Sequence, residues 1–477
     1  MPQRNTGAMR ALSAEKHRSD VSIDAGCLTI CHDWIVHIHR DHSSADFETT
    51  PGGTGNQPEE TLKDSAETAN TAREVTTADA ENDENRQPAA TGKKRHGLLR
   101  NLWWIVPGIV FPIVCALITL IPVPYVVNAP GPTVNILGTH EGAPTIQISG
   151  NDPKTGKPVE LDPVHETEQD DGDQTGQLRM VTVLQRGGPG NSLATLDLIR
   201  AWFSGHDEII PYREVFPPDV TSEEAKEAAQ MQMKSSESAA SVVALEHLGW
   251  DVPADVQVEG AVPGSDAVGK VEQGDQIVSI TTPDGTVHPV DSGSVPFALM
   301  RTVPPDSQMT LTVVRNGKTI DIPIVSSKKA LPDPDSEEAT SSSLLGVYLS
   351  VHPQLPLDID ITLQDVGGPS AGMMFALGIY DRLTPGDLTG GVIIAGTGAL
   401  SFDGQVEPIG GIQQKMVGAN NDGAQWFLAP GTNCDEVVGH IPDGLNVTRV
   451  DTFDDALTAV TAIAAGTTDS LPTCEAR

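Results

Sequence analysis

The stretch "DVGGPSAGMMFALGIYDRL", residues 365–383, raises the question on which the interpretation of this chain depends. A Gly-Gly-Pro turn leads into a single serine, Ser370, and an apolar run that reads as a helix follows it. Packing alone explains small residues at this point, because they let a helix lie close to a neighbour. A nucleophile explains them equally well, because a reactive hydroxyl needs room for its substrate. The surrounding residues have to decide between the two interpretations.

The segment 345–466 alternates between strand-like and helical patterns. Strand-like "LLGVYLSV" and "DIDITL" precede the serine helix. After it, "GGVIIAGTGAL" reads as a buried strand, "QVEPIGGIQQKMVGANNDGA" as a turn and a helix, and "WFLAP" as another strand. Strands that alternate with helices are typical of α/β domains. We therefore predict an α/β domain over residues 345–466.

A serine hydroxyl becomes a good nucleophile only when a base removes its proton. The domain offers His352 and His440, neither in a motif, and Lys415, which follows a Gly-Gly turn at the start of a helix. A lysine can be the base if burial keeps its amine neutral; an ordinary surface lysine is the alternative. Thr397, at the end of a buried strand, could orient that amine. Ser370 lies at the positive end of its helix, where free N–H groups can hold an oxyanion.

Three segments in this order resemble the proteolytic domain of Lon-type serine proteases: "GGPSAG", then "LTGGVIIAGTGALSFDGQVEPIGGIQQKMVGANNDGAQWFLAP", then "NC". That family uses a Ser–Lys dyad, with the serine in a Pro-Ser-Ala-Gly motif and the lysine after an Ile-Gly-Gly turn. The resemblance covers roughly residues 345–466. It implies that Ser370 is the nucleophile, Lys415 the general base and Thr397 the partner of the lysine. It also implies a polypeptide substrate, requires neither a cofactor nor a metal, and is compatible with a homo-oligomer.

Two departures from the family bear on the activity. ATP-dependent Lon enzymes carry an acidic residue directly before Gly-Pro-Ser, where this chain has Gly367, with Asp365 two residues earlier. Those enzymes also carry an ATPase, whereas this sequence contains no G-x-x-x-x-G-K-[ST] motif. We therefore expect a protease that acts without ATP on flexible or already unfolded polypeptide.

Residues 251–328 alternate apolar and polar residues in short runs separated by Gly and Pro turns, and "RNGK" reads as a hairpin turn. Within this region "VPGSDAVGKVEQGDQIVSI", residues 262–280, resembles PDZ domains of the bacterial protease type, with Gly274 and Asp275 as turn formers. The resemblance implies a mostly β domain that binds extended peptide by strand addition. The preceding region, 128–250, is mixed and includes a capped helix over residues 221–250.

The segment "LLRNLWWIVPGIVFPIVCALITLIPVPYVV" predicts a single transmembrane helix over residues 102–124, because it carries no charge from Leu102 to Val123. Lys93, Lys94, Arg95 and Arg100 lie just before it, and no Lys or Arg follows closely. The positive-inside rule therefore places the N-terminus in the cytoplasm and everything after the span outside the cell membrane. We interpret the span as an uncleaved anchor.

The charge and the cysteines of the chain limit its partners and its compartment. A formal charge of −35 repels phosphate backbones, so we expect no nucleic-acid partner. Residues 43–92 are polar and acidic, which predicts disorder, and the Cys/His cluster before them fits no zinc spacing. Cys434 and Cys474 are the two cysteines expected outside, in an oxidising compartment, and we predict a disulfide between them.

The predicted organisation runs from anchor to protease. Its parts are a disordered acidic cytoplasmic tail (1–92), a transmembrane helix (102–124), an extracellular mixed region within or beside the PDZ-like domain (128–250), the PDZ-like domain (251–328), a linker (329–344), the Lon-type domain (345–466) and a C-terminal tail (467–477). This combination resembles the membrane-anchored PDZ–Lon proteins of Gram-positive bacteria. A catalytically silent PDZ scaffold that binds envelope proteins is the alternative. A signal-peptidase-like Ser–Lys enzyme is disfavoured, because its serine would have to lie at the membrane surface.

Overall fold

The computed structural model describes residues 110–111, 113, 121–140, 142–163, 176–217, 220–328, 342–363 and 366–475. The predicted cytoplasmic tail with its Cys/His cluster lies outside these residues, as do most of the predicted span and linker. In the part of the chain that is described, no helix is both long and apolar enough to cross a bilayer. Pro122–Val123, which the sequence placed at the end of the span, form strand β1, paired with β7 (Leu193–Ala194).

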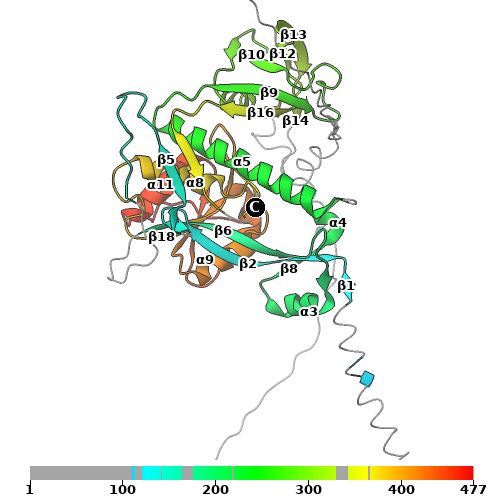
Figure 1. Ribbon diagram of the computed structural model, residues 1–477, viewed down its shortest axis with the longest axis vertical. Coiled ribbons are helices and arrows are strands. Elements are labelled where there is room, and N and C mark those ends of the chain that lie inside the picture. The colour runs from blue at the N-terminus through cyan, green and yellow to red at the C-terminus, as the bar shows by residue number, and fades with distance from the viewer. Residues whose placement is uncertain are drawn as a thin grey trace, which may run out of the picture. The chain divides into compact units, whose positions relative to one another are not determined.

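A six-stranded mixed sheet forms the centre of the α/β body, in the order β22-β21-β18-β6-β2-β8 (Figure 1). The first four strands in this order are parallel, and β2 runs antiparallel to both β6 and β8. The six strands are β22 (Asn446–Val450), β21 (Trp426–Pro430), β18 (Ile393–Gly396), β6 (Gln177–Arg186), β2 (Tyr125–Asn135) and β8 (Glu208–Pro211).

Helices cover both faces of this sheet because alternate residues of its strands point to opposite sides. Ile394 and Leu428 belong to the core on the side of α5 (Ser222–His247), α8 (Gly372–Leu383) and α11 (Phe453–Ala464). Their neighbours Ala395 and Phe427 belong to the core on the side of α9 (Ile412–Asn421) and α10 (Cys434–Val437). The sheet is therefore buried on both sides, as its apolar strands predict.

Local patterns in the sequence account for several of these helices. The predicted capping box is confirmed at the start of α5, where the side chains of Thr221 and Glu224 each bind the other's backbone N–H. The helix predicted after Ser370 is α8, which is buried along nearly its whole length, from Gly372 to Ile379. A helix that is apolar all round has to be packed on several sides, and α8 lies between the sheet, α5 and α11.

A second, antiparallel sheet has the strand order β13-β12-β10-β9-β16, with β11 also pairing with β10. This sheet has a hydrophobic core of its own. The turn predicted at "RNGK" is confirmed, since Asn316 and Gly317 both have positive φ between β12 and β13. Gly274 also has positive φ and forms a turn with Asp275 before β10, as expected. The elements are β9 (Ala254–Ala261), β10 (Gln276–Thr281), β11 (Val287–Pro289), α6 (Val295–Met300), β12 (Gln308–Arg315), β13 (Lys318–Val325) and β16 (Val347–Pro353).

The α/β body differs from the predicted boundary at residue 345. Strand β16 was expected to open this body, but it pairs with β9 of the second sheet. Conversely β2, β6 and β8, which belong to the predicted mixed region 128–250 or its N-terminal edge, are half of the central sheet. The second sheet is therefore inserted between α5 and β17 (Asp358–Ile361), which pairs with β5 (Ile146–Ser149). An alternating sequence pattern predicts that a strand exists, but it does not predict which strand it pairs with. Here β6 pairs with β18, which lies more than 200 residues later in the sequence.

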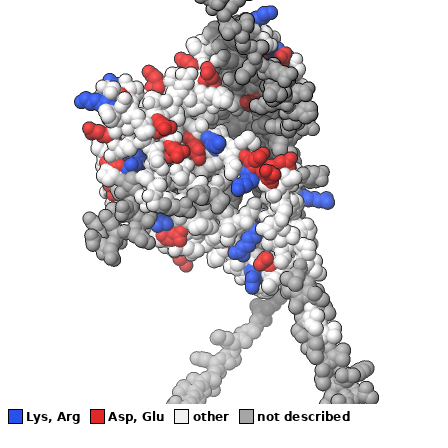
Figure 2. All heavy atoms as spheres, in the orientation of Figure 1, with Lys and Arg blue, Asp and Glu red and all other residues white. Residues whose placement is uncertain are grey.

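Short elements complete the described structure. They are α3 (Thr195–Ser204), α4 (Tyr212–Val215), η1 (Gly431–Asn433), β3 (Thr139–His140), β4 (Ala143–Pro144), β14 (Ser327–Lys328), β15 (Ser343–Leu344), β19 (Ala399–Leu400) and β20 (Val406–Glu407). On the face drawn in Figure 2, acidic and basic side chains are interspersed over the described surface. The absence of a nucleic-acid partner remains a prediction from charge.

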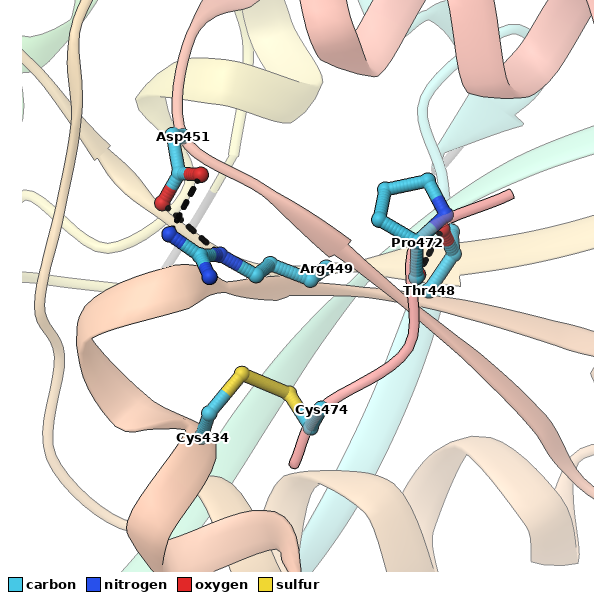
Figure 3. The surroundings of a disulfide bond; sticks show 6 residues. All are labelled: Cys434, Thr448, Arg449, Asp451, Pro472 and Cys474. Atoms are coloured by element: carbon cyan, nitrogen blue, oxygen red, sulfur yellow. Dashed lines mark hydrogen bonds and ion pairs between the residues drawn. A yellow bond between two sulfur atoms is a disulfide. The ribbon is translucent and has the colours of Figure 1, made fainter. Parts of the chain in front are cut away.

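The C-terminal segment is attached to the sheet at two points (Figure 3). The carbonyl of Pro472 accepts hydrogen bonds from Thr448 Oγ1, at 2.8 Å, and from the N–H of Arg449, at 2.9 Å, both in β22. Cys474 is disulfide-bonded to Cys434 at the start of α10. The tail, predicted from residue 467, is thus joined to the edge strand and to a helix on the same body.

Candidate active site

Lys415 lies in the first turn of α9, and its side chain points into the protein interior. Gly411 precedes the helix with φ 69°, a left-handed conformation that a glycine adopts without strain. The N–H of Lys415 donates to the carbonyl of Gly411, at 3.0 Å. Only 4% of the lysine is exposed. Burial lowers the pKa of Lys415 to about 7, against the opposing charge of Glu436, so a large fraction of the amine is neutral near neutral pH.

Thr397 connects Lys415 to the backbone of Ser370. Lys415 Nζ donates to Thr397 Oγ1 at 3.2 Å, and Thr397 Oγ1 donates to the carbonyl oxygen of Ser370 at 3.0 Å. A hydroxyl has one hydrogen to donate, so Thr397 can only accept from the amine. The lone pair of the neutral amine is therefore not used by Thr397 and is available for another proton.

Ser370 is half-buried in the turn directly before α8, as the sequence predicted. The end of β18 holds this turn: the N–H of Gly398 donates to the carbonyl of Ser370 at 2.8 Å, and the N–H of Met373 donates to the carbonyl of Gly398 at 3.1 Å. The described contacts include no direct hydrogen bond between the Ser370 and Lys415 side chains. The structure brings the three predicted residues together through Thr397.

Helix α5 supports the turn before Ser370 in a way that the sequence did not indicate. The N–H of Gly368 donates to the carbonyl of Ala229 at 3.0 Å, and Ser236 Oγ donates to the carbonyl of Pro369 at 2.9 Å. A Cβ at Gly367 would lie 2.9 Å from the Cβ of Ala229. This close approach favours a glycine at position 367, because a side chain there would displace the turn or α5. Asp365 lies outside the described residues.

Asn433 supports the turn before Lys415 and was not predicted as a site residue, although its Asn-Cys pair belongs to the resemblance. Its side chain accepts from the N–H of Ile409 at 3.0 Å and donates to the carbonyl of the same residue at 2.9 Å. It also donates to Glu436 Oε1 at 2.8 Å. Asn433 therefore holds the segment before Gly410 and Gly411, from which α9 and Lys415 start.

The two histidines considered as alternative bases have other positions. His352 lies in β16 of the second sheet, where Nε2 is 3.2 Å from Ser350 Oγ, and His440 Nδ1 is 3.2 Å from the carbonyl oxygen of Val438. Within the described residues, neither histidine makes a hydrogen bond to Ser370. Across these same residues, no group of three or more His, Cys, Asp or Glu side chains is arranged to hold a metal ion.

The part of the chain that contains Ser370, Thr397 and Lys415 matches a known protein family. Residues 362–462 match the family described as the Lon protease (S16) C-terminal proteolytic domain. The chain is 36% identical over 109 residues to Lon protease 2 of Bacillus subtilis, covering 21% of this chain and 19% of that protein. It is 37% identical over 94 residues to the Lon protease of Campylobacter concisus, covering 19% of this chain and 11% of that protein.

The match to the Lon protease of Helicobacter pylori is longer. The two chains are 28% identical over 153 residues, which is 30% of this chain and 17% of that protein. The chain thus spans less than a fifth of the length of these relatives. The family match begins after β2, β6, β8 and α5, although these elements belong to the same α/β body. The chain contains a Lon protease (S16) C-terminal proteolytic domain.

Proposed function

We propose that this protein is an ATP-independent, membrane-anchored serine endopeptidase in which Ser370 and Lys415 form a catalytic dyad. The observation that carries the proposal is the buried Lys415 amine, with a pKa lowered to about 7, joined through Thr397 to the backbone of Ser370. Burying a lysine amine disfavours its charged form, because desolvation of the ammonium is costly, and the neutral amine is the form that a general base requires.

The proposed reaction has two stages. The neutral Lys415 amine takes the Ser370 proton as Oγ attacks the substrate carbonyl carbon, and the resulting ammonium protonates the leaving amine as the peptide bond breaks. Lys415 then takes a proton from water as the water oxygen attacks the acyl-enzyme carbonyl carbon. The Lys415 ammonium returns that proton to Ser370 Oγ as the ester bond breaks, which releases the acid product and restores the neutral amine. Thr397 remains an acceptor throughout and keeps the lysine nitrogen in place.

The start of α8 supplies groups suited to the oxyanion of each tetrahedral intermediate. Among the described contacts, the N–H groups of Ser370 and Ala371 take part in no hydrogen bond. Both precede the first helical residue, Gly372, where the helix dipole favours negative charge. Donors of this kind contribute about 3 kcal/mol each to the stabilisation of such intermediates.

Substrate selection and location form the second part of the proposal. The inserted sheet is proposed to act as a PDZ domain that binds flexible or unfolded exported polypeptide as an added strand. Its strand β16 is an edge of that sheet, and the chain leads from it through β17 to Ser370. The apolar residues 102–124 are proposed to anchor the chain in the cell membrane, with the N-terminus in the cytoplasm and both domains outside.

The full chain in detergent, assayed without nucleotide on a fluorescently labelled unfolded protein, tests the activity. Wild type should cleave, and Ser370→Ala and Lys415→Arg should each lose at least about 10³-fold, because nucleophile and base act as a unit. Lys270→Arg is the matched control, since Lys270 is an exposed lysine in the second sheet. Thr397→Ala should lose about 10²-fold, and Thr397→Ser, which keeps the hydroxyl, should recover most of it.

Full cleavage by folded Lys415→Arg would exclude the dyad. Peptide binding by a wild-type chain that cleaves nothing would instead support the scaffold. Topology is tested separately with a membrane-impermeant thiol reagent on intact cells. A cysteine at Asp335 should react and one at Asn70 should not, and equal labelling of both would refute the proposed orientation.

A further inference from the structure

Helix α3 exposes an apolar face that packing does not explain. Trp202 is 78% exposed and Phe203 84%, and Leu196 and Ile199 are 38% and 40% exposed. At 100° per residue these four side chains occupy an arc of about 120° on the helix. The opposite side of α3, which carries Leu198 and Ala201, packs on the sheet. One apolar side of α3 therefore packs on the protein, and the other is exposed. An exposed apolar face of this kind indicates that the helix contacts a second apolar surface.

The start of α3 is bound to Ile121, which lies near the C-terminal end of the proposed membrane span. The N–H of Thr195 and its Oγ1 both donate to the carbonyl of Ile121, at 3.0 and 2.8 Å. The next residues continue this attachment, since Pro122 pairs with Ala194 and Val123 with Leu193. The C-terminal end of the proposed span therefore lies close to the first turn of α3.

More apolar surface surrounds this junction. Ile121, Leu184 and Tyr125 are 51%, 45% and 37% exposed. A hollow of about 300 Å³ is lined mainly by apolar side chains: Pro122, Val123, Pro124, Tyr125, Leu193 and Tyr212, with Gly188 and Ser192. Basic side chains also lie at this end of the body (Figure 2). Arg200 of α3 is 68% exposed and lies 3.7 Å from Asp197 of the same helix. Aromatic, aliphatic and basic side chains together are the composition of a helix lying in a membrane surface.

We propose that α3 lies in the surface of the lipid bilayer that the proposed anchor crosses before Ile121, with Leu196, Ile199, Trp202 and Phe203 at the boundary between headgroups and acyl chains. This inference rests on the proposed anchor. The attachment at Ile121 leaves α3 no room to move far from the point at which the span would leave the bilayer. The indole N–H of Trp202 can bind headgroup oxygens while its ring meets acyl chains.

Seating α3 in the membrane would also set the position of the active site. Directly after α3, the carbonyl of His206 accepts a hydrogen bond from Gln414 Nε2 at 3.2 Å. Gln414 is buried in α9 and is the neighbour of Lys415. The hydrogen bond between His206 and Gln414 thus connects the loop after α3 to the helix that carries Lys415. If α3 lies in the membrane surface, this connection would hold the active site at a fixed distance from the bilayer.

Fluorescence of the full chain in vesicles of phosphatidylcholine and phosphatidylglycerol tests this placement. Cys27, Cys31 and Cys115 are replaced by serine, and a polarity-sensitive label is attached at Phe203→Cys. Val287→Cys is the matched control, because Val287 is also apolar and 58% exposed but lies in the second sheet. We expect a blue-shifted emission at position 203, quenched several-fold more strongly by lipids with a nitroxide near the headgroup than emission at position 287.

The outcomes separate the inference from the anchor on which it rests. A chain that floats with the vesicles but shows no lipid quenching at position 203 keeps its anchor and overturns the seating of α3. A chain that does not float overturns both. A blue shift at position 203 without lipid quenching overturns the inference in favour of a second copy of the chain, because a protein contact excludes water without bringing nitroxide lipid to the label.

Discussion

Arg301 and Asp403 join the inserted sheet to the segment that connects two residues of the candidate site. Arg301 Nε lies 2.5 Å from Asp403 Oδ2, and Nη2 lies 3.2 Å from Oδ1, so the contact is bidentate. Arg301 directly follows α6, and Asp403 lies in the turn between β19 and β20. That hairpin follows Thr397 and precedes Lys415 along the chain. The pair thus joins the inserted domain to the α/β body at a hairpin that lies, along the chain, between Thr397 and Lys415.

Removal of Arg301 should destabilise the protein strongly. The Asp403 side chain is only 4% exposed, so Arg301→Ala leaves a buried carboxylate without its cation, at a cost of about 3 kcal/mol. The double variant Arg301→Ala/Asp403→Ala should be less destabilised than the sum of the two single variants. Urea unfolding of all four chains measures this coupling.

Lys270 and Asp266 provide the matched control for this cycle. Their side chains are 2.7 Å apart but 39% and 36% exposed, so Lys270→Ala should cost much less stability than Arg301→Ala. If Arg301→Ala costs no more than Lys270→Ala, the pair does not stabilise the contact between the domains.

The pH dependence of hydrolysis should report the state of Lys415. Its pKa is lowered to about 7 by burial, and the dyad requires the neutral amine. The kcat/KM value should therefore rise with pH through about 7 and level off above it. A value of kcat/KM that keeps rising towards pH 10 would mean that the lysine titrates like an exposed one, and that the base is not buried as described.

The same pKa shift predicts how stability changes with pH. Between the folded pKa of about 7 and the ordinary value of 10.5, the unfolded chain binds more protons at Lys415 than the folded chain does. The free energy of unfolding contributed by this residue therefore rises with pH across that window and is unchanged below it. Lys415→Met should remove this rise. Identical pH profiles of urea unfolding for the two chains would contradict the shift.

Gly367 should tolerate no side chain while Ala229 faces it. A Cβ added at Gly367 would lie 2.9 Å from the Cβ of Ala229, so Gly367→Ala should displace the turn before Ser370 and lower kcat by about 10²-fold. Ala229→Gly should restore much of this loss by making room, although a glycine in α5 costs about 1 kcal/mol of stability. Peptidase assays on the single and double variants decide the point. Failure of Ala229→Gly to rescue would show that contact with α5 is not the cause.

The disulfide between Cys434 and Cys474 should stabilise the α/β body. It closes a loop with a sequence separation of 40, for which the chain-entropy model gives about 4 kcal/mol. Reduction, or Cys474→Ser, should lower the melting temperature while leaving the Lys415 environment intact. Thiol titration of denatured, unreduced chain with Cys27, Cys31 and Cys115 replaced should find no free thiol. Two free thiols per chain would refute the bond.

Local sequence patterns determined much of this protein before any fold was known. The capping box at Thr221, the turn at Asn316 and Gly317, and the helix after Ser370 all depend on residues a few positions apart. Such features are set by backbone preferences and by hydrogen bonds within one turn. The order of motifs likewise pointed to Ser370, Thr397 and Lys415, because each stands beside a turn or strand end that the sequence makes recognisable.

Only the tertiary structure decided what surrounds those residues. The depressed pKa of Lys415 comes from complete burial, which depends on packing around α9 from distant parts of the chain. The support from Ala229 and Ser236, and the contribution of β2, β6 and β8 to the central sheet, join segments more than 100 residues apart. An isolated strand or helix pattern carries no information about its distant partner. Pairing is selected by which apolar faces can be buried together in three dimensions, and that selection made one body of two segments separated by an inserted sheet.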